Sequence, residues 1–319
     1  MSGSTRGIHH ITAIAGDPQR NLDFYSGVLG SRLVKRTVNF DDPTTYHLYY
    51  GDERGRPGTI LTFFPWAGVP RGSISQGQTS ATSFAIPADS LEYWEDRLAR
   101  HAIDYRGPSP RFGNGVLTFA DPDGLRLELC ALPEASDQPG WGGGPVDSRH
   151  SIRGFHAATL TLGSHERTAA VLSEVLGFRE VGIEGDRRRY ETEAGGLASR
   201  VDLVSAPGSP RGRMGAGTVH HIAWRAADDL EQQTLRGRAI QHGLDPTEVL
   251  DRQYFRSVYF REPGGVLFEI ATDAPGFDVD ESVEELGTHL ELPPWLERMR
   301  AKIEQALPPL HVAARGSAS

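Results

Sequence analysis

Cysteine is almost absent from this chain. Cys130 is the single cysteine among 319 residues, which excludes an internal disulfide framework and fits a reducing cytoplasm. It lies in an apolar segment, so we expect a buried and inert thiol. The chain also lacks an apolar run long enough to span a membrane, and its start carries no apolar signal segment. We therefore expect a cytoplasmic protein without a membrane partner.

Basic residues are also fewer than acidic residues. The sequence has 33 lysine and arginine residues against 42 aspartate and glutamate residues, which gives a net charge of -9. No basic stripe stands out, so a nucleic-acid partner is not expected. The apolar content of 38% and the charged content of 24% are typical of a soluble globular protein. The length suffices for one large or two ordinary domains.

One pattern of apolar residues occurs four times. Each copy begins with a short strand, continues with an amphipathic helix and ends in extended segments separated by Gly, Pro and Asp turns. The four helices are expected at about 18–30, 90–101, 166–176 and 229–242. The repeat is longer than a solenoid repeat and has one helix per copy, so the sequence predicts βαβββ modules. The predicted fold class is α+β, with four such modules in two tandem domains.

The domain boundaries follow from composition. Residues 7–132 hold the first two modules, and residues 150–273 hold the last two. The intervening segment 133–149 is rich in Gly and Pro, which is typical of a linker. After residue 273 the strand pattern stops, and 274–310 is predicted to be a helical tail that packs across the body or across the mouth of a site.

Two pairs of adjacent histidines stand out. His9 and His10 lie in the first strand, and His220 and His221 lie in the strand that opens the fourth module. Side chains alternate between the faces of a strand, so we expect only one histidine of each pair to face a given cavity. Glu269 lies in an apolar run near the end of the fourth module. Two histidines and one carboxylate form the facial triad that holds Fe(II) or a similar divalent ion.

Alignment of the four modules selects the ligands. The equivalent first-strand positions hold His10, Thr82, Ala157 and His221, and the equivalent last-strand positions hold Glu128 and Glu269. Only the first and fourth modules together supply three ligands, namely His10, His221 and Glu269. The sequence therefore predicts that these two modules pair around one metal ion. Modules two and three should form a metal-free counterpart.

Several segments resemble one known superfamily. They are Gly7-Ile8-His9-His10-Ile11-Thr12, Tyr46-His47-Leu48-Tyr49-Tyr50, Arg56-Pro57-Gly58-Thr59, Asp251-Arg252-Gln253-Tyr254-Phe255 and Pro263-Gly264-Gly265-Val266-Leu267-Phe268-Glu269. Together with the four modules they resemble the vicinal oxygen chelate superfamily of glyoxalases, bleomycin resistance proteins and extradiol dioxygenases. Within it, the chain is similar to the ring dioxygenases that cleave hydroquinones.

The resemblance implies a function and assigns roles. It implies an extradiol-type dioxygenase that opens hydroquinone-type or catechol-type rings with O₂, takes part in the degradation of aromatic compounds, and uses Fe(II) or alternatively Mn(II). The partners would be a small aromatic substrate and O₂, while homo-oligomer formation stays open. Arg252 would stabilise charge on the oxygenated intermediate, and Tyr259 would donate a hydrogen bond. The residues that would orient the ligands or relay protons are His9, Thr12 and His220.

Each of these residues also has a plainer interpretation. His9 and His220 can simply pack with a hydrogen bond, Arg252 can pair with Asp251 or Glu248, and Tyr259 can belong to the core.

His47 and His156 fit strands but have no identifiable ligand partner. The run Arg187-Arg188-Arg189 is interpreted as a solvated turn and strand start.

Two other functions stay open at this point. A glyoxalase-like isomerase or thiol transferase commonly needs a second carboxylate ligand, which the segment 59–64 does not supply. A non-catalytic protein that binds an aromatic compound or an antibiotic would need no metal triad.

Overall fold

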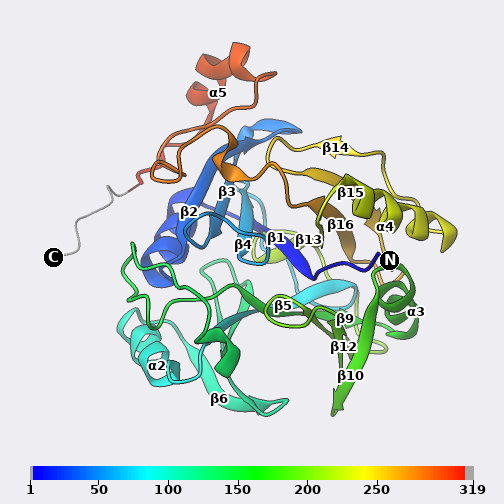
Figure 1. The fold of residues 1–319 in the computed structure, drawn as a ribbon. Helices are drawn as coiled ribbons and strands as arrows, with labels where there is room; N and C mark the ends of the chain where they lie inside the picture. Colours follow the sequence, from blue (N-terminus) through cyan, green and yellow to red (C-terminus); the bar gives the residue numbers. More distant parts are fainter. Residues whose placement is uncertain (1–2, 313–319) are drawn as a thin grey trace.

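The computed structural model describes residues 3–312, and two eight-stranded sheets form its body (Figure 1). The first sheet has, in spatial order, β14 (Leu250–Asp251), β15 (Arg256–Arg261), β16 (Leu267–Thr272), β13 (Thr218–Ala226), β1 (Ile8–Ala15), β4 (Ile60–Pro65), β3 (Asp42–Gly51) and β2 (Arg32–Asn39). The second sheet has, in order, β10 (Phe178–Glu184), β11 (Arg187–Thr192), β12 (Arg200–Ser205), β9 (Phe155–Leu162), β5 (Gln78–Pro87), β8 (Arg126–Leu132), β7 (Asn114–Ala120) and β6 (Tyr105–Arg111).

The strand order shows how the modules pair. The first sheet joins the first and fourth modules through the antiparallel contact of β1 with β13, and the second sheet joins the second and third through β5 and β9. This confirms the predicted α+β class and the predicted pairing of modules. Each sheet thus combines strands from both halves of the chain, and the division into domains at 133–149 stays a prediction.

The helices lie close to the predicted places. They are α1 (Pro18–Leu22) with the π-helix η1 (Asp23–Val28), α2 (Leu91–Arg100), α3 (Glu166–Ala170) with the π-helix η3 (Val171–Val175), and α4 (Asp229–Gln241). The first and third modules therefore share the same helix irregularity, as expected of repeated units. Strands β6 and β14 were not predicted. None of the helices within residues 3–312 has the length and apolarity to cross a membrane.

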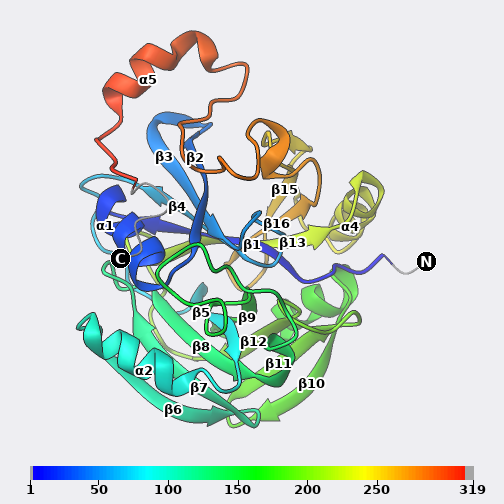
Figure 2. The same cartoon turned by 60° about the vertical axis from the view of Figure 1, so that its left-hand side comes forward.

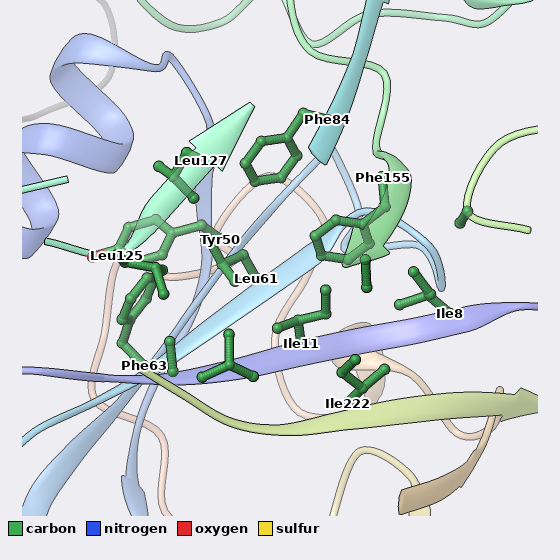
Figure 3. Close-up of a cluster of buried hydrophobic side chains, with 14 of the residues drawn as sticks. Ile8, Ile11, Tyr50, Leu61, Phe63, Phe84, Leu125, Leu127, Phe155 and Ile222 are labelled. Atoms are coloured by element: carbon green, nitrogen blue, oxygen red, sulfur yellow. The ribbon is translucent and has the colours of Figure 1, made fainter. Parts of the chain in front are cut away.

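Apolar side chains fill the space between the two sheets, as Figure 3 shows around Ile11, Leu61 and Phe84. Phe84 of β5 stacks on Phe155 of β9, with ring centroids 5.4 Å apart. These residues and Cys130 are buried, as predicted for the thiol. Burial of large apolar side chains is the main favourable term in folding, so this shared core holds the two sheets together.

The tail packs against the first sheet. It contains η4 (Phe277–Val279), η5 (Glu297–Met299) and α5 (Arg300–Ala306), and Figure 2 shows α5 beyond the ends of β2 and β3. Trp295 contacts Phe40 at the turn between β2 and β3, with ring centroids 5.6 Å apart. The Tyr46 hydroxyl of β3 donates to the carbonyl of Pro308 at 3.0 Å.

Two bulges shape the centre of the first sheet. The register of β1 against β13 slips by one residue at His9 and again at His220. A bulge places two residues opposite one and interrupts the alternation of faces. The expectation that only one histidine of each pair faces a given cavity is therefore wrong for His220 and His221, which line the same cavity, while His10 lines that cavity without His9.

Candidate metal centre

Three predicted ligands meet at the middle of the first sheet. His10 of β1, His221 of β13 and Glu269 of β16 are buried, and together they form a group that could hold a metal ion. Oε2 of Glu269 lies 3.3 Å from Nε2 of His10 and 2.9 Å from Nε2 of His221. The two Nε2 atoms lie 3.4 Å apart. The structure thus brings together the three residues that module alignment selected.

The geometry and chemistry of this group fit a divalent ion. Around an ion with bonds of about 2.1 Å, neighbouring ligand atoms lie roughly 3.0 to 3.4 Å apart, close to the three distances here. Ser257 donates to Oε1 of Glu269, while Oε2 is buried without a hydrogen-bond partner. Burial alone would raise the pKa of Glu269, but His10 and His221 hold it well below its usual range. An anionic oxygen facing two imidazoles is a suitable cation ligand.

The other histidine of each pair, His9 or His220, contacts the candidate ligand through a ring nitrogen. Nδ1 of His9 lies 2.9 Å from Nδ1 of His10, and Nδ1 of His220 lies 2.8 Å from Nδ1 of His221. A hydrogen bond between two ring nitrogens needs a proton on one of them. If both ligands turn lone pairs at Nε2 toward an ion, that proton sits on Nδ1 of His10 and of His221. His9 and His220 are then acceptors that fix the tautomer of each ligand.

Burial keeps both orienting histidines neutral. Burial and the neighbouring His10 hold the pKa of His9 well below its usual range. Burial and His221 lower the pKa of His220 to about 3. Because the Nδ1 of each ring accepts a hydrogen bond, the neutral ring carries its own proton on Nε2. His220 therefore presents a donor.

A cavity of about 310 Å³ opens beside the triad. It is lined by residues of both modules: His10, Asn39, Phe40, Asp41, His47, Tyr49, Phe64, Trp66, His220, His221, Arg252, Phe255, Tyr259 and Leu267. Aromatic and apolar side chains dominate, with a few polar groups near the imidazoles of His10 and His221. Cavities of this size and composition are typical of sites for small organic molecules.

A series of side-chain hydrogen bonds lies in the wall of this cavity, and the sequence did not predict it. The Tyr49 hydroxyl lies 2.8 Å from Nδ1 of His47, and Nε2 of His47 lies 2.7 Å from the Thr62 hydroxyl. Thr62 donates to Thr12 at 3.0 Å. Thr62 thus accepts from Nε2–H of His47, and Nδ1 accepts from Tyr49. Burial, together with His10 and His221, holds the pKa of His47 well below its usual range.

Arg252 and Tyr259 lie on the opposite wall. The Arg252 guanidinium lies 5.5 Å from the centroid of the Tyr259 ring, within reach of a cation–π contact. Arg252 also pairs with Asp41 at 3.1 Å, rather than with Asp251 or Glu248, the partners considered from the sequence. Burial and Glu269 raise the pKa of Tyr259, so its hydroxyl keeps its proton. The structure places a permanent positive charge and a hydrogen-bond donor beside the triad.

The second sheet shows why its equivalent positions do not form a metal group. Thr82 and Ala157 offer no imidazole, and the carboxylate of Glu128 is paired with Arg111. The run of arginines is only partly solvated, contrary to our interpretation. Arg189 is buried and forms a bidentate pair with Asp202, at 2.8 and 2.9 Å. Buried charges need such partners, and a run of like charges in the sequence does not reveal them.

Fold and site together define a protein of paired βαβββ modules with a candidate metal centre. The family model described as "Glyoxalase/Bleomycin resistance protein/Dioxygenase superfamily" matches residues 7–129 and 154–270. The chain belongs to this superfamily, as its sequence predicted.

Relatives that match over nearly the whole length of this chain indicate which kind of protein within the superfamily it is. A Bacillus subtilis protein provisionally named ring-cleaving dioxygenase MhqO is 50% identical, over 98% of this chain and 99% of that protein. The chlorohydroquinone/hydroquinone 1,2-dioxygenase of Sphingobium indicum is 36% identical, over 93% of this chain and 94% of that protein. These relatives confirm the prediction of a ring-cleaving dioxygenase.

Solved structures agree on the fold. The crystal structure of a provisionally identified dioxygenase from Bacillus subtilis has a TM-score of 0.92 and 49% identity, covering 97% of this chain and 99% of that one. Glyoxalase I from Zea mays has a TM-score of 0.64 at 14% identity, covering 89% of this chain and 97% of that one. The second likeness concerns the fold alone.

Proposed function

We propose that this ring-cleaving dioxygenase opens hydroquinone-type rings by extradiol-type chemistry, with Fe(II) held by His10, His221 and Glu269. The observation that carries the proposal is the convergence of three ligand atoms, 2.9 to 3.4 Å apart, beside an aromatic cavity. A facial triad leaves coordination positions open. When bound, the ion would acidify a phenolic hydroxyl and transfer electrons between the ring and O₂.

The cavity walls bind and orient the ring. Phe40, Phe64, Trp66 and Phe255 offer apolar surfaces to an aromatic substrate and exclude water from it. Low polarity strengthens the electrostatic effect of the few charged groups present. Arg252 then stabilises negative charge that develops as the ring is oxidised, and Tyr259 donates a hydrogen bond to the same region.

Tyr49 and His47 form the proton acceptor. The oxygen of Tyr49 has a lone pair beside its bond to Nδ1 of His47. It can take the proton of a substrate hydroxyl while it passes its own proton to His47. The resulting imidazolium would be stabilised by Thr62 at Nε2. His220 cannot take this role in the tautomer that orients His221, because its Nε2 already carries a proton.

The activity is tested with anaerobically prepared apoprotein loaded with Fe(II). Hydroquinone and catechol are supplied in air-saturated buffer, and O₂ uptake and the ring-opened product are measured together. Incorporation of both oxygen atoms from labelled O₂, with a product that carries one carboxylate and one carbonyl, is the expected result. Glu128→Gln should behave like the wild type, and Glu269→Gln should be inactive. Absence of O₂ uptake with every ring tested would refute the proposal.

A further inference from the structure

Two buried carboxylate oxygens stand out within residues 3–312. Oε2 of Glu269 and Oε1 of Glu281 are the carboxylate oxygens there that are buried and have no hydrogen-bond partner. A buried carboxylate oxygen without a partner is unfavourable unless a hydrogen-bond donor or a cation compensates it. Glu269 belongs to the metal triad of the cavity. Glu281 belongs to a second cluster of ligand-type residues, with His289 and Glu291, whose ligand atoms lie within 4.8 Å of one another.

This second cluster lies in the tail segment that runs beside β2. Leu290 forms a bridge with Arg36, and the backbone N–H of Glu291 donates to the carbonyl of Arg36 at 2.9 Å. Glu281 is buried, Glu291 is half-buried and His289 is exposed. A hydrogen bond between Nδ1 of His289 and Thr288 leaves Nε2 as a ligand atom. The two less buried side chains can rotate to close the remaining distance.

The charges around Glu281 are not balanced. Lys35 on β2 is fully buried and pairs with Glu281 and with Asp280. Asp280 and Glu281 therefore share one ammonium group, and Glu291 adds a third carboxylate beside Glu281. An excess of negative charge in a partly buried cluster is what a divalent cation would neutralise.

We propose that Glu281, His289 and Glu291 form a second, structural metal site that binds a divalent transition ion of the Zn²⁺ class. One imidazole and two carboxylates form a mixed ligand set that suits Zn²⁺, with water completing the shell. The site is separate from the metal triad of His10, His221 and Glu269, because its ligands all come from the tail.

A cation at this place would fasten the tail to the sheet that carries the active site. Glu281 is joined to β2 through Lys35, and His289 and Glu291 flank the bridge at Leu290. Beyond β2 the chain turns at Phe40, which lines the cavity and contacts Trp295 of the tail. The second ion would thus stabilise the tail that supports the cavity wall.

The test is equilibrium dialysis of the full chain against buffered Zn²⁺, with metal content measured per chain. The wild type should bind about two ions, and both Glu269→Gln and His289→Ala should bind about one, because each removes a ligand from a different site. The variant with both changes should bind about none. Zn²⁺ should also raise the melting temperature of Glu269→Gln and should not do so once His289→Ala is added.

The matched control is Glu285→Gln, which changes an exposed tail carboxylate outside the cluster. It should bind as many ions as the wild type. Two results would overturn the second site: His289→Ala that still binds both ions, or Glu269→Gln that binds none while its unfolding curve shows a folded protein. Neither result depends on whether the enzyme opens rings.

Discussion

Tyr49 and His47 are joined by a 2.8 Å hydrogen bond in the wall of the cavity. Both side chains lie on the same face of β3, and Thr62 and Thr12 continue the chain across β4 and β1. His47 itself is not a member of the metal triad. A half-buried, neutral imidazole with a partner at each nitrogen is suited to pass a proton between them.

We expect His47→Ala to reduce kcat about 100-fold while metal content stays unchanged, because general acid–base groups typically contribute that much or more. Tyr49→Phe should have a similar effect, since it removes the oxygen that faces the substrate. Thr62→Ser keeps the hydroxyl that accepts from His47 and should keep activity near the wild-type value. Steady-state O₂ uptake and metal analysis check this together. Loss of metal in His47→Ala would instead indicate a structural role.

The triad itself should control metal retention. His10→Ala, His221→Ala and Glu269→Gln should each lower metal affinity by at least about 100-fold, because even loss of a residue that only orients a ligand costs 10- to 100-fold. Glu128→Gln changes the equivalent carboxylate of the second sheet, which pairs with Arg111, and should retain the active-site ion. Metal titration followed by fluorescence or calorimetry distinguishes the four variants. Equal loss in Glu128→Gln would contradict the assignment to the first sheet.

Arg252 should not be replaceable by lysine. Its planar guanidinium lies over Tyr259 and pairs with Asp41, a geometry that an ammonium group cannot reproduce. We expect Arg252→Lys to lower kcat/KM by roughly tenfold or more, corresponding to about 1.4 kcal/mol of transition-state stabilisation. Asp41 is 73% exposed, so Asp41→Asn should change kcat/KM by less than about threefold. A comparable loss of kcat/KM in both variants would show that the ion pair with Asp41, rather than the shape of the guanidinium, determines the activity.

Much of the site could be predicted from sequence because the modules repeat. Thr82 and Ala157 occupy the positions where the first and fourth modules have His10 and His221. That difference alone selected the pair of modules that the first sheet brings together. The repeat also explains the accurate helix positions, since each helix follows its strand at a similar distance.

Other features depend on contacts between strands and could not be predicted this way. The bulges at His9 and His220 arise where β1 pairs with β13, and they decide that neighbouring histidines bond to each other. The sequence places His47 on a strand, but its role depends on the register that sets Tyr49 opposite Thr62. Such registers follow from long-range packing, which one sequence does not reveal.

His156 should make the protein sensitive to acid. It is buried in the second sheet, and burial, together with Arg189 and Arg200, holds its pKa well below 6.5. The unfolded chain therefore binds a proton below about pH 6.5 that the folded chain does not bind. The free energy of unfolding should fall as pH decreases, by about 1.4 kcal/mol per pH unit for this group.

The variant His156→Gln isolates this contribution. Glutamine can still accept the hydrogen bond from Arg200, which lies 3.3 Å from Nδ1 of His156, but it does not titrate. Urea unfolding between about pH 5 and pH 7 should show a shallower dependence in the variant, by the slope of one histidine. An unchanged slope would mean that His156 binds its proton in both states. The site lies outside the metal triad, so both proteins can be compared with the same metal content.

Lys35 should be essential for the stability of the tail. Its ammonium is fully buried, pairs with Glu281 and with Asp280, and lies 4.9 Å from the centroid of the Tyr254 ring. Lys35→Met keeps most of the side-chain volume but leaves Glu281 buried without its cation. Breaking a buried pair in this way costs about 3–5 kcal/mol, and urea unfolding of the metal-free proteins should show a loss of this size. Lys302→Met, at an exposed position of α5, should change stability by less than about 0.5 kcal/mol.

Adding Glu281→Gln to Lys35→Met should recover part of the loss of stability, because it removes the unpaired charge. A further loss of stability in that double variant would contradict the electrostatic explanation.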